Sequence, residues 1–317
     1  MESEMKPIIK LAFSDFWPGF DPDNNYFTQL LRTRFNVVIS DTPDFLIYSW
    51  FGKSHLKYKC YRIFFSGENE RPDFRICDFA FTFDHLDHPD HYRLPLYALY
   101  CEPEALIKRN FNAEQVLADK KKFCNFVYSN HRCRKRNQLF RQLSKYRQVD
   151  SGGRYLNSIG GPVRDKMAFI QQYKFTIAFE NESSPGYTTE KIVQPMLAGS
   201  LPIYWGNPLV HLDFNPKSFI NYYDYGSNEA LIERVIEVGQ NDDLYLEYLR
   251  QPNYIDNQIP DMIKAENVLR QFDYIFSTTR VPVAVRRSRF YFVDQMRRYI
   301  VRDIPWMARR MAGNILR

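Results

Sequence analysis

Short apolar runs separated by longer polar or helical connections are the feature that most constrains the fold of this chain. In the first part of the sequence these runs cover residues 8–13, 36–39, 45–50, 61–66 and 79–83. In the second part they cover residues 123–128, 147–150, 175–179, 201–205 and 219–222. Strands that alternate with longer connections are typical of parallel sheets in α/β proteins. The sequence therefore predicts two α/β domains in tandem, with a boundary near residue 118.

The positive charge of the chain is concentrated in its C-terminal tail, residues 286–317. This tail has nine Arg, no Lys and two Asp, whereas the whole chain has a net charge of +6. The rest of the chain is therefore close to neutral. A basic tail on a neutral body argues against a nucleic-acid-binding groove in the fold itself.

Three features predict a cytoplasmic protein without a membrane span. The first residues are acidic, whereas a secretory signal begins with basic residues. The five Cys are scattered and include no C-x-x-C pair, which predicts reduced thiols and supplies no zinc site. The uncharged run 193–212 is broken by three Pro and two Gly. It favours a buried helix, a turn and a strand over a transmembrane helix.

The segment FENESSPGYTTEK, residues 179–191, gathers carboxylates, hydroxyls, an amide and a Lys directly after a strand-like run. A basic segment, SNHRCRKRN, follows another strand at residues 129–137. Strand-to-helix turns of this kind face anionic ligands in open α/β sheets. An Arg and a Lys from two such turns would neutralise a pyrophosphate together, which favours a sugar nucleotide. In the alternative interpretation, Thr189 only caps a helix, and Glu190 and Lys191 form a solvated pair.

The residues from FENESSPGYTTEK to PIYWG resemble the signature of the α-1,3-fucosyltransferases of glycosyltransferase family ten. That signature runs F-E-N-x-x-x-x-x-Y-x-T-E-K, followed by a small-residue turn and P-I/V-Y-W-G. Other pieces agree in the same order, namely FFSGENERPDF, FTFDHLDHPDHYRLPLY, SNHRCRKRN and DFNPKSFIN. The resemblance covers residues 8–275 and is closest to bacterial members.

The resemblance implies an α/β protein of GT-B fold, with two Rossmann-like domains facing across a cleft and a basic amphipathic helical tail. The expected divisions are an acceptor-binding domain at 1–118, a GDP-fucose-binding domain at 119–275 and the tail at 276–317. The implied reaction is inverting transfer of L-fucose from GDP-fucose to the 3-OH of GlcNAc, or Glc, in an N-acetyllactosamine-like oligosaccharide, as in Lewis x-type glycans. No metal ion or other cofactor is expected. An α-1,4 linkage or another nucleotide sugar is the alternative, and a membrane- or nucleic-acid-binding module is the alternative of a different class.

Six residues receive roles from the resemblance: Glu68 as general base, Arg136 and Lys191 as diphosphate ligands, and Asn181, Tyr187 and Glu190 as further donor contacts. Glu68 follows a strand-like run, and Gly67 is expected to let the chain turn sharply there. Glu70 is the rival candidate for the base. An inverting transfer needs one carboxylate to take the proton of the acceptor hydroxyl while cations stabilise the departing GDP.

Two other segments have open interpretations. One of them is HLDHPDH, residues 85–91, which has three His and, together with the preceding Asp84, three Asp. Pro89 breaks any helical face on which the imidazoles would converge. A structural or acceptor-side role is therefore favoured over metal binding. SGGRYLNSIGG, residues 151–161, is either a loop that approaches the nucleotide or a plain turn, because a lone glycine-rich loop is a weak signal.

The tail has a helical apolar period of its own. One face has the apolar residues Val293, Met296, Ile300, Ile304, Met307 and Met311. Arg298, Arg302 and Arg309 fall on the opposite face. This pattern favours peripheral binding to the anionic inner membrane. The alternative is that the apolar face of the tail packs on the rest of the protein. RNA binding through the same arginines is disfavoured because they are interleaved with a continuous row of apolar residues.

Overall fold

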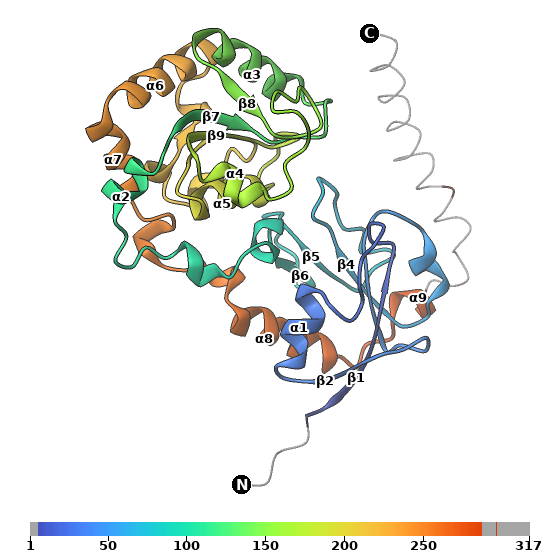
Figure 1. The fold of residues 1–317 in the computed structure, drawn as a ribbon. Coiled ribbons are helices and arrows are strands. Elements are labelled where there is room, and N and C mark those ends of the chain that lie inside the picture. Colours follow the sequence, from blue (N-terminus) through green and yellow to red (C-terminus); the bar gives the residue numbers. More distant parts are fainter. Residues whose placement is uncertain (1–5, 287–295, 297–317) are drawn as a thin grey trace. The chain divides into compact units, whose positions relative to one another are not determined.

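The computed structural model describes residues 6–286 and Met296, which form two sheets flanked by helices (Figure 1). The first sheet has the strand order β2-β1-β3-β4-β5-β6 and the second has the order β11-β10-β9-β7-β8. The strands of the first sheet are β1 Ile8–Ser14, β2 Asn36–Ile39, β3 Phe45–Tyr48, β4 Tyr61–Phe65, β5 Phe79–Thr82 and β6 His91–Arg93. Those of the second are β7 Lys122–Phe126, β8 Val149–Ser151, β9 Tyr173–Phe179, β10 Leu201–Trp205 and β11 Ile220–Asn221.

The strands form because their side chains are buried on both faces. All four residues of β3 are buried, and so is every residue of β9 except Lys174. The second sheet is parallel throughout, and β1 pairs in parallel with both β2 and β3. Continuous apolar strands are expected where helices cover both faces of a parallel sheet. Each of the ten predicted apolar runs overlaps a strand, whereas the short strand β6 was not predicted.

The helices α1 to α5 lie in the connections between these strands, and α6 to α9 follow the last strand. They are α1 Tyr26–Arg32, α2 Ala113–Ala118, α3 Arg134–Tyr146, α4 Lys166–Ile170, α5 Glu190–Leu197, α6 Asn228–Gln240, α7 Asp242–Arg250, α8 Ala265–Phe276 and α9 Val283–Arg286. In the second sheet, α3 lies on one side of β7 and β9, and α4 and α5 lie on the other (Figure 1). The run 193–212 thus forms most of α5, a turn and β10, as predicted. Within the described residues, no helix combines the length and the apolar character that crossing a membrane requires.

The described residues form two compact units, and each unit is built from separate stretches of the sequence. Unit 1 consists of residues 6–65, 72–80 and 274–286, and unit 2 of residues 66–71 and 81–273. The turn after β4 therefore belongs to unit 2 although the strand belongs to unit 1. The domain limits 1–118, 119–275 and 276–317 stay predictions, and most of the tail lies outside the described residues.

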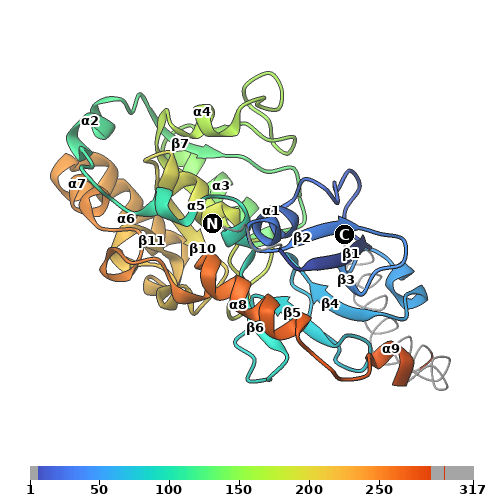
Figure 2. The same ribbon diagram turned by 90° about the horizontal axis from the view of Figure 1, so that it is seen from below.

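Unit 1 is completed by a segment from the far end of the chain. Val283 is buried, and its N–H donates a hydrogen bond to Asp78 Oδ1 at 2.7 Å. The ring centroid of Phe276 lies 4.6 Å from that of Phe45 in β3. Figure 2 shows α9 beside β4. Residues 274–286, called the return segment below, thus contribute Ile275 and Val283 to the core of unit 1.

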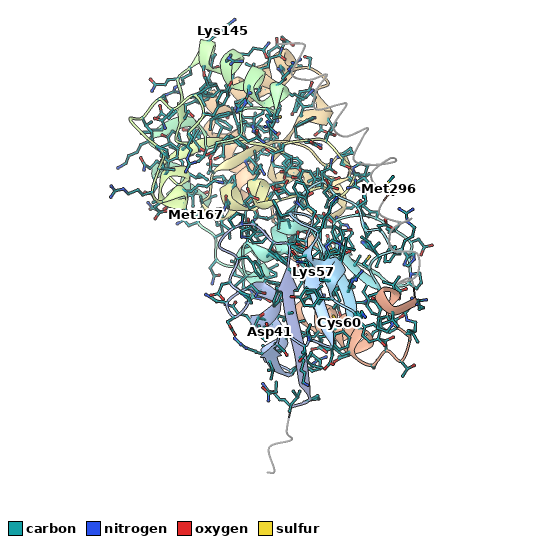
Figure 3. All side chains as sticks on the ribbon, turned by 90° about the vertical axis from the view of Figure 1, so that its right-hand side faces the viewer. Asp41, Lys57, Cys60, Lys145, Met167 and Met296 are labelled. Atoms are coloured by element: carbon teal, nitrogen blue, oxygen red, sulfur yellow. The ribbon has the colours of Figure 1, made fainter. Side chains whose placement is uncertain are left out.

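A depression of about 500 Å³ lies at the amino ends of β3 and β4 in unit 1. Asp41, Lys57 and Cys60 are among its lining residues and are labelled in Figure 3. Ligands of open α/β sheets bind at the carboxyl ends of the strands instead. We therefore assign no ligand to this depression.

Candidate functional site

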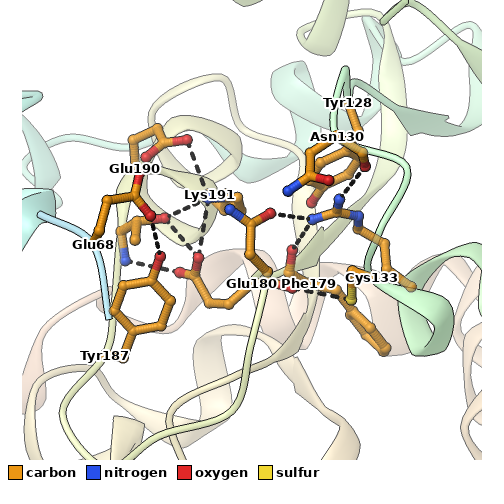
Figure 4. Close-up of polar contacts among 12 residues, drawn as sticks. Glu68, Tyr128, Asn130, Cys133, Phe179, Glu180, Tyr187, Glu190 and Lys191 are labelled. Atoms are coloured by element: carbon orange, nitrogen blue, oxygen red, sulfur yellow. Dashed lines mark hydrogen bonds and ion pairs between the residues drawn. The ribbon is translucent and has the colours of Figure 1, made fainter. Parts of the chain in front are cut away.

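Glu180 follows the last residue of β9 and is the centre of a buried polar network (Figure 4). Its carboxylate accepts hydrogen bonds from the N–H of Thr189 at 2.8 Å and from the Thr189 hydroxyl at 2.7 Å. Thr189 directly precedes α5, and an N–H at a helix start has no partner within the helix. Glu180 therefore satisfies the beginning of α5 and fixes it against the end of β9.

Lys191, in the first turn of α5, lies between two carboxylates. Its Nζ is 3.1 Å from Glu180 Oε2 and 3.4 Å from Glu190 Oε1, and it donates to the Thr189 hydroxyl at 2.9 Å. Burial lowers the pKa of Lys191, but the charges of Glu180 and Glu190 outweigh burial and hold it well above the ordinary value. Lys191 is consequently a charged group in a buried position.

The two acidic partners of Lys191 differ in their electrostatics. Burial raises the pKa of Glu180 above the ordinary value, and Lys191 offsets this only in part. Burial alone would also raise the pKa of Glu190. The charges of Lys191 and Lys166 lower this pKa by more than burial raises it, so the net shift is downward. Glu190 is thus the carboxylate that these lysines hold ionised.

Arg136 is fully buried in the first turn of α3. Its guanidinium donates to the carbonyl of Phe179 at 3.3 Å, to Asn181 Oδ1 at 2.9 Å and to the carbonyl of Asn130 at 2.6 Å. It also lies over the ring of Tyr128, 3.8 Å from the centroid. Among the described residues, no carboxylate forms an ion pair with Arg136, and its Nε has no hydrogen-bond partner. A buried cation without a counter-charge is costly, so this position favours an anionic ligand.

Glu68 lies in the turn that follows β4, within unit 2. Its Oε2 is 3.5 Å from the hydroxyl of the buried Tyr187, at the outer limit of a hydrogen bond. Burial raises the pKa of Glu68 above the ordinary value, and the charge of Lys191 lowers it by less. A carboxylate with a raised pKa is a stronger base than one in water.

The expected role of Gly67 in a sharp turn stays a prediction, because the structure shows only how its backbone is placed. Gly67 is absent from the glycines with positive φ among the described residues, so the turn does not depend on a left-handed backbone there. Instead, a Cβ at this position would lie 2.5 Å from Cδ1 of Leu96. The Leu96 side chain therefore packs directly against the turn and would have to shift if Gly67 carried a Cβ.

The structure brings the six predicted site residues together in pairs within unit 2. Glu68 meets Tyr187, Glu190 meets Lys191, and Arg136 meets Asn181. Glu180, at the end of β9, connects these pairs (Figure 4). Its carbonyl accepts a hydrogen bond from Cys133, which directly precedes α3, at 3.5 Å, and its carboxylate forms the ion pair with Lys191.

The sequence interpretation missed several residues of this network. Glu180 stands in the FEN motif but received no role, although its carboxylate organises α5. Asn207 is fully buried and accepts hydrogen bonds from the N–H groups of Gly186 at 2.7 Å and Leu209 at 2.8 Å. Burial lowers the pKa of Lys166, whose charge acts on Glu190. Of these residues only Glu180 has a signal in the sequence, namely its place in the motif.

The two segments with open interpretations have structural contacts. The N–H of Tyr155, in the loop 151–161, donates to the carbonyl of Tyr128 at 3.0 Å. His91 opens β6, and its Nε2 lies 2.8 Å from the Thr82 hydroxyl. Within residues 6–286, no three His, Cys, Asp or Glu side chains are grouped so as to hold a metal ion.

Comparison with sequence families identifies both halves of the chain. Residues 11–100 match the Alpha-(1,3)-fucosyltransferase FucT N-terminal domain. Residues 117–271 match the C-terminal part of Glycosyltransferase family 10 (fucosyltransferase). The chain is 31% identical over 291 residues to Alpha-(1,3)-fucosyltransferase FucT of Helicobacter pylori, which covers 78% of this chain and 61% of that protein. It is 33% identical over 143 residues to Alpha-(1,3)-fucosyltransferase B of Drosophila melanogaster, covering 39% of this chain and 32% of that protein. The chain thus spans less than two thirds of the length of these relatives.

Solved structures agree with the sequence families. A crystal structure of an alpha1,3-fucosyltransferase superposes with a TM-score of 0.78 at 28% identity, covering 89% of this chain and 93% of that one. A crystal structure of alpha1,3-fucosyltransferase with GDP-fucose superposes with a TM-score of 0.76 at 27% identity, covering 89% and 94%. These matches confirm the predicted α/β GT-B fold class. Both halves of the chain match, and so does the fold: the protein belongs to glycosyltransferase family 10, the fucosyltransferases.

Proposed function

We propose that this protein is an inverting α-1,3-fucosyltransferase that uses GDP-fucose as its donor. Its proposed acceptor is the 3-OH of GlcNAc, or Glc, in an N-acetyllactosamine-like oligosaccharide, as in Lewis x-type glycans. The observation that carries the proposal is Arg136, a buried guanidinium without an ion-pair partner among the described residues. The family membership and the likeness to a structure with GDP-fucose support the identity of the donor.

The diphosphate of the donor would meet Arg136 and Lys191. Arg136 offers a charge that has no counter-ion among the residues that the structure describes. Lys191 stands at the start of α5, where the helix dipole favours anions. The contact of Lys191 with Glu190 is the longer of its two carboxylate contacts, 3.4 Å against 3.1 Å. On donor binding, the diphosphate would replace Glu190 at the ammonium, and Glu190 would then accept from the ribose hydroxyls. Asn181 and Tyr187 would contact the donor beside them.

Glu68 would act as the general base. Its carboxylate takes the proton of the acceptor hydroxyl, whose oxygen attacks the anomeric carbon of fucose. The bond between that carbon and the diphosphate breaks at the same time, and GDP leaves with its charge stabilised by Arg136 and Lys191. A single carboxylate is sufficient because the configuration inverts. No step in this scheme requires a metal ligand from the protein.

The donor site is tested by the affinity for GDP-fucose. Arg136→Ala and Lys191→Met each remove a cation from the proposed diphosphate site and should weaken binding by about 2–5 kcal/mol. Arg134→Ala is the matched control, because Arg134 is exposed in the same turn of α3. Calorimetric titration gives the affinities, and a rise in melting temperature with GDP shows that the folded chain binds it. Unchanged affinity in both folded variants would contradict the assignment of Arg136 and Lys191 to the diphosphate. Linkage analysis of the product decides between α-1,3 and α-1,4 transfer.

We also propose that residues 286–317 bind the anionic inner membrane. This proposal rests on the sequence of the tail, whose residues lie outside the described part of the chain except for Arg286 and Met296. Each Arg near an anionic surface contributes about 1 kcal/mol, and Trp306 would anchor at the interface. The full-length chain should sediment with anionic but not neutral vesicles, and salt should weaken this binding. A chain ending at Asp303 should lose vesicle binding and keep turnover of a soluble acceptor; equal binding by both chains contradicts the proposal.

A further inference from the structure

The turn that carries Glu68 is fastened to the segment proposed to bind the donor. Asn69 Nδ2 donates to Glu182 Oε2 at 2.6 Å, and Arg71 Nη2 donates to the Ser184 hydroxyl at 2.7 Å. Glu182 and Ser184 both belong to the FENESSPGYTTEK segment. Two side chains of the turn 66–71, which is called the base turn below, thus reach the loop between β9 and α5. These contacts agree with the division of the chain, in which residues 66–71 belong to unit 2 and the strand before them belongs to unit 1.

Arg71 is the junction of these contacts. Besides Ser184, its guanidinium donates to Asn69 Oδ1 at 3.1 Å and forms an ion pair of 2.6 Å with Asp84 Oδ1. It also lies over the ring of Phe83, 4.6 Å from the centroid. One planar group therefore joins the base turn, the donor segment and the end of β5. A Lys has a single nitrogen at its tip and cannot reproduce these directed contacts.

The partners of Arg71 are themselves held in place. The hydroxyl of Thr82 donates to Asp84 Oδ2 at 2.8 Å, so both oxygens of Asp84 are engaged. The ring of Phe83 lies 5.1 Å from that of Tyr187, whose hydroxyl faces Glu68. A ring of contacts thus runs from Glu68 through Tyr187 and Phe83 to Arg71, and back along the turn to Glu68.

Glu68 needs such support because its own carboxylate is weakly held. The contact with the Tyr187 hydroxyl is 3.5 Å, too long to fix the direction of the carboxylate. Its backbone is better fixed: the Ser66 hydroxyl donates to the carbonyl of Glu68 at 3.0 Å and accepts from its N–H at 3.1 Å. The position of the carboxylate therefore depends on where the whole turn is fastened.

We infer that Arg71 is a positioning residue for the proposed base Glu68. It holds the base turn in register with the donor segment, so that the base and the donor residues are aligned within unit 2 alone. The inference rests on the proposed function. It assigns to Arg71 no contact with the donor or the acceptor.

A double-mutant cycle with Glu68 tests the inference. Arg71→Gln should lower kcat by about tenfold or more, since a displaced base loses part of its usual contribution of about 10²–10⁴-fold. The affinity for GDP, measured by calorimetry, should change little. In the background of Glu68→Gln, the substitution Arg71→Gln should cause no further loss of kcat, because residues that act through one group are not additive. Arg71→Lys should recover less than the full rate.

The control is Arg250→Gln in the same unit. Arg250 also forms an ion pair with a carboxylate, that of Glu114, and its side chain is 53% exposed against 46% for Arg71. This substitution should leave kcat unchanged. If the losses from Arg71→Gln and Glu68→Gln multiply, Arg71 does not act through Glu68 and the inference is overturned. If the wild-type chain transfers no fucose, or Glu68→Gln retains full turnover, the proposed function or the base assignment fails instead.

The ratio of transfer to hydrolysis is a second readout. Fucosyl transfer needs a base aimed at the acceptor hydroxyl, whereas slow hydrolysis of GDP-fucose needs only the donor site and water. Arg71→Gln should therefore lower transfer more than hydrolysis. An equal fall in both rates would indicate a general structural defect and would contradict a positioning role.

Discussion

Glu68 is half-buried, and its protonation would limit the proposed reaction. Below its pKa the carboxyl is protonated and cannot accept a proton from the acceptor hydroxyl. Because burial raises this pKa above the ordinary value of 4.5, the loss of turnover with falling pH should begin at a higher pH than for an exposed Glu. A pH profile of kcat/KM should show this acid limb above pH 4.5, and a limb at or below that value would contradict the assignment.

The substitution Glu68→Gln tests the same residue directly. The amide keeps the shape of the side chain but cannot take a proton, so kcat should fall by about 10²–10⁴-fold. The affinity for GDP-fucose should stay nearly unchanged, because Glu68 is not placed at the diphosphate. Glu70→Gln is the matched variant in the same turn. If Glu70→Gln is the inactive one and Glu68→Gln is not, the base has been misassigned.

The loop between β9 and α5 depends on local backbone geometry. Gly186 in this loop has φ +81°, and a Cβ there would lie 2.3 Å from the carbonyl oxygen of Phe83. Gly186→Ala should therefore cost both the strain of a left-handed backbone, about 1–2 kcal/mol, and the displacement of the loop from Phe83. Gly226 is the control, because it has φ +72° and nothing within 4 Å of an added Cβ. Urea unfolding should show a larger loss for Gly186→Ala than for Gly226→Ala, and GDP affinity should fall only in the former; equal effects would show that strain alone matters.

The sequence predicted these elements unequally, for physical reasons. Strands such as β3 and β9 are buried on both faces, so their apolar runs are continuous and easy to find. The strand β6 has the sequence HYR and is only half-buried, so no apolar run marks it. Glu180 stands in a motif, but a sequence does not show that its carboxylate turns inward to meet Thr189. Lys166 reaches the network only because α4 packs near α5, a long-range contact that no local pattern contains.

At the scale of the whole molecule, the return segment should decide the stability of unit 1. A chain ending at Arg286 keeps Phe276 and Val283 and should unfold at the same urea concentration as the full-length protein. A chain ending at Asp273 loses both and leaves Asp78 without the N–H of Val283. It also loses Ile275, which is fully buried. Truncating one buried Ile typically costs about 2–5 kcal/mol, so the second chain should be destabilised by at least that amount. Equal midpoints for the two shortened chains would show that the return segment is dispensable.

The return segment also sets the order in which the molecule is completed during synthesis. The strands β1 to β4 leave the ribosome early, but the residues that cover Phe45 and pair with Asp78 are made only after all of unit 2. The intervening stretch of about 190 residues takes roughly 10–40 s to translate at about 5–20 residues per second. Unit 2, which includes every residue of the proposed catalytic site, is fully translated before unit 1 is whole. During this interval, part of the apolar surface of the early strands is exposed in the growing chain. A chaperone would therefore bind unit 1 most effectively at this stage.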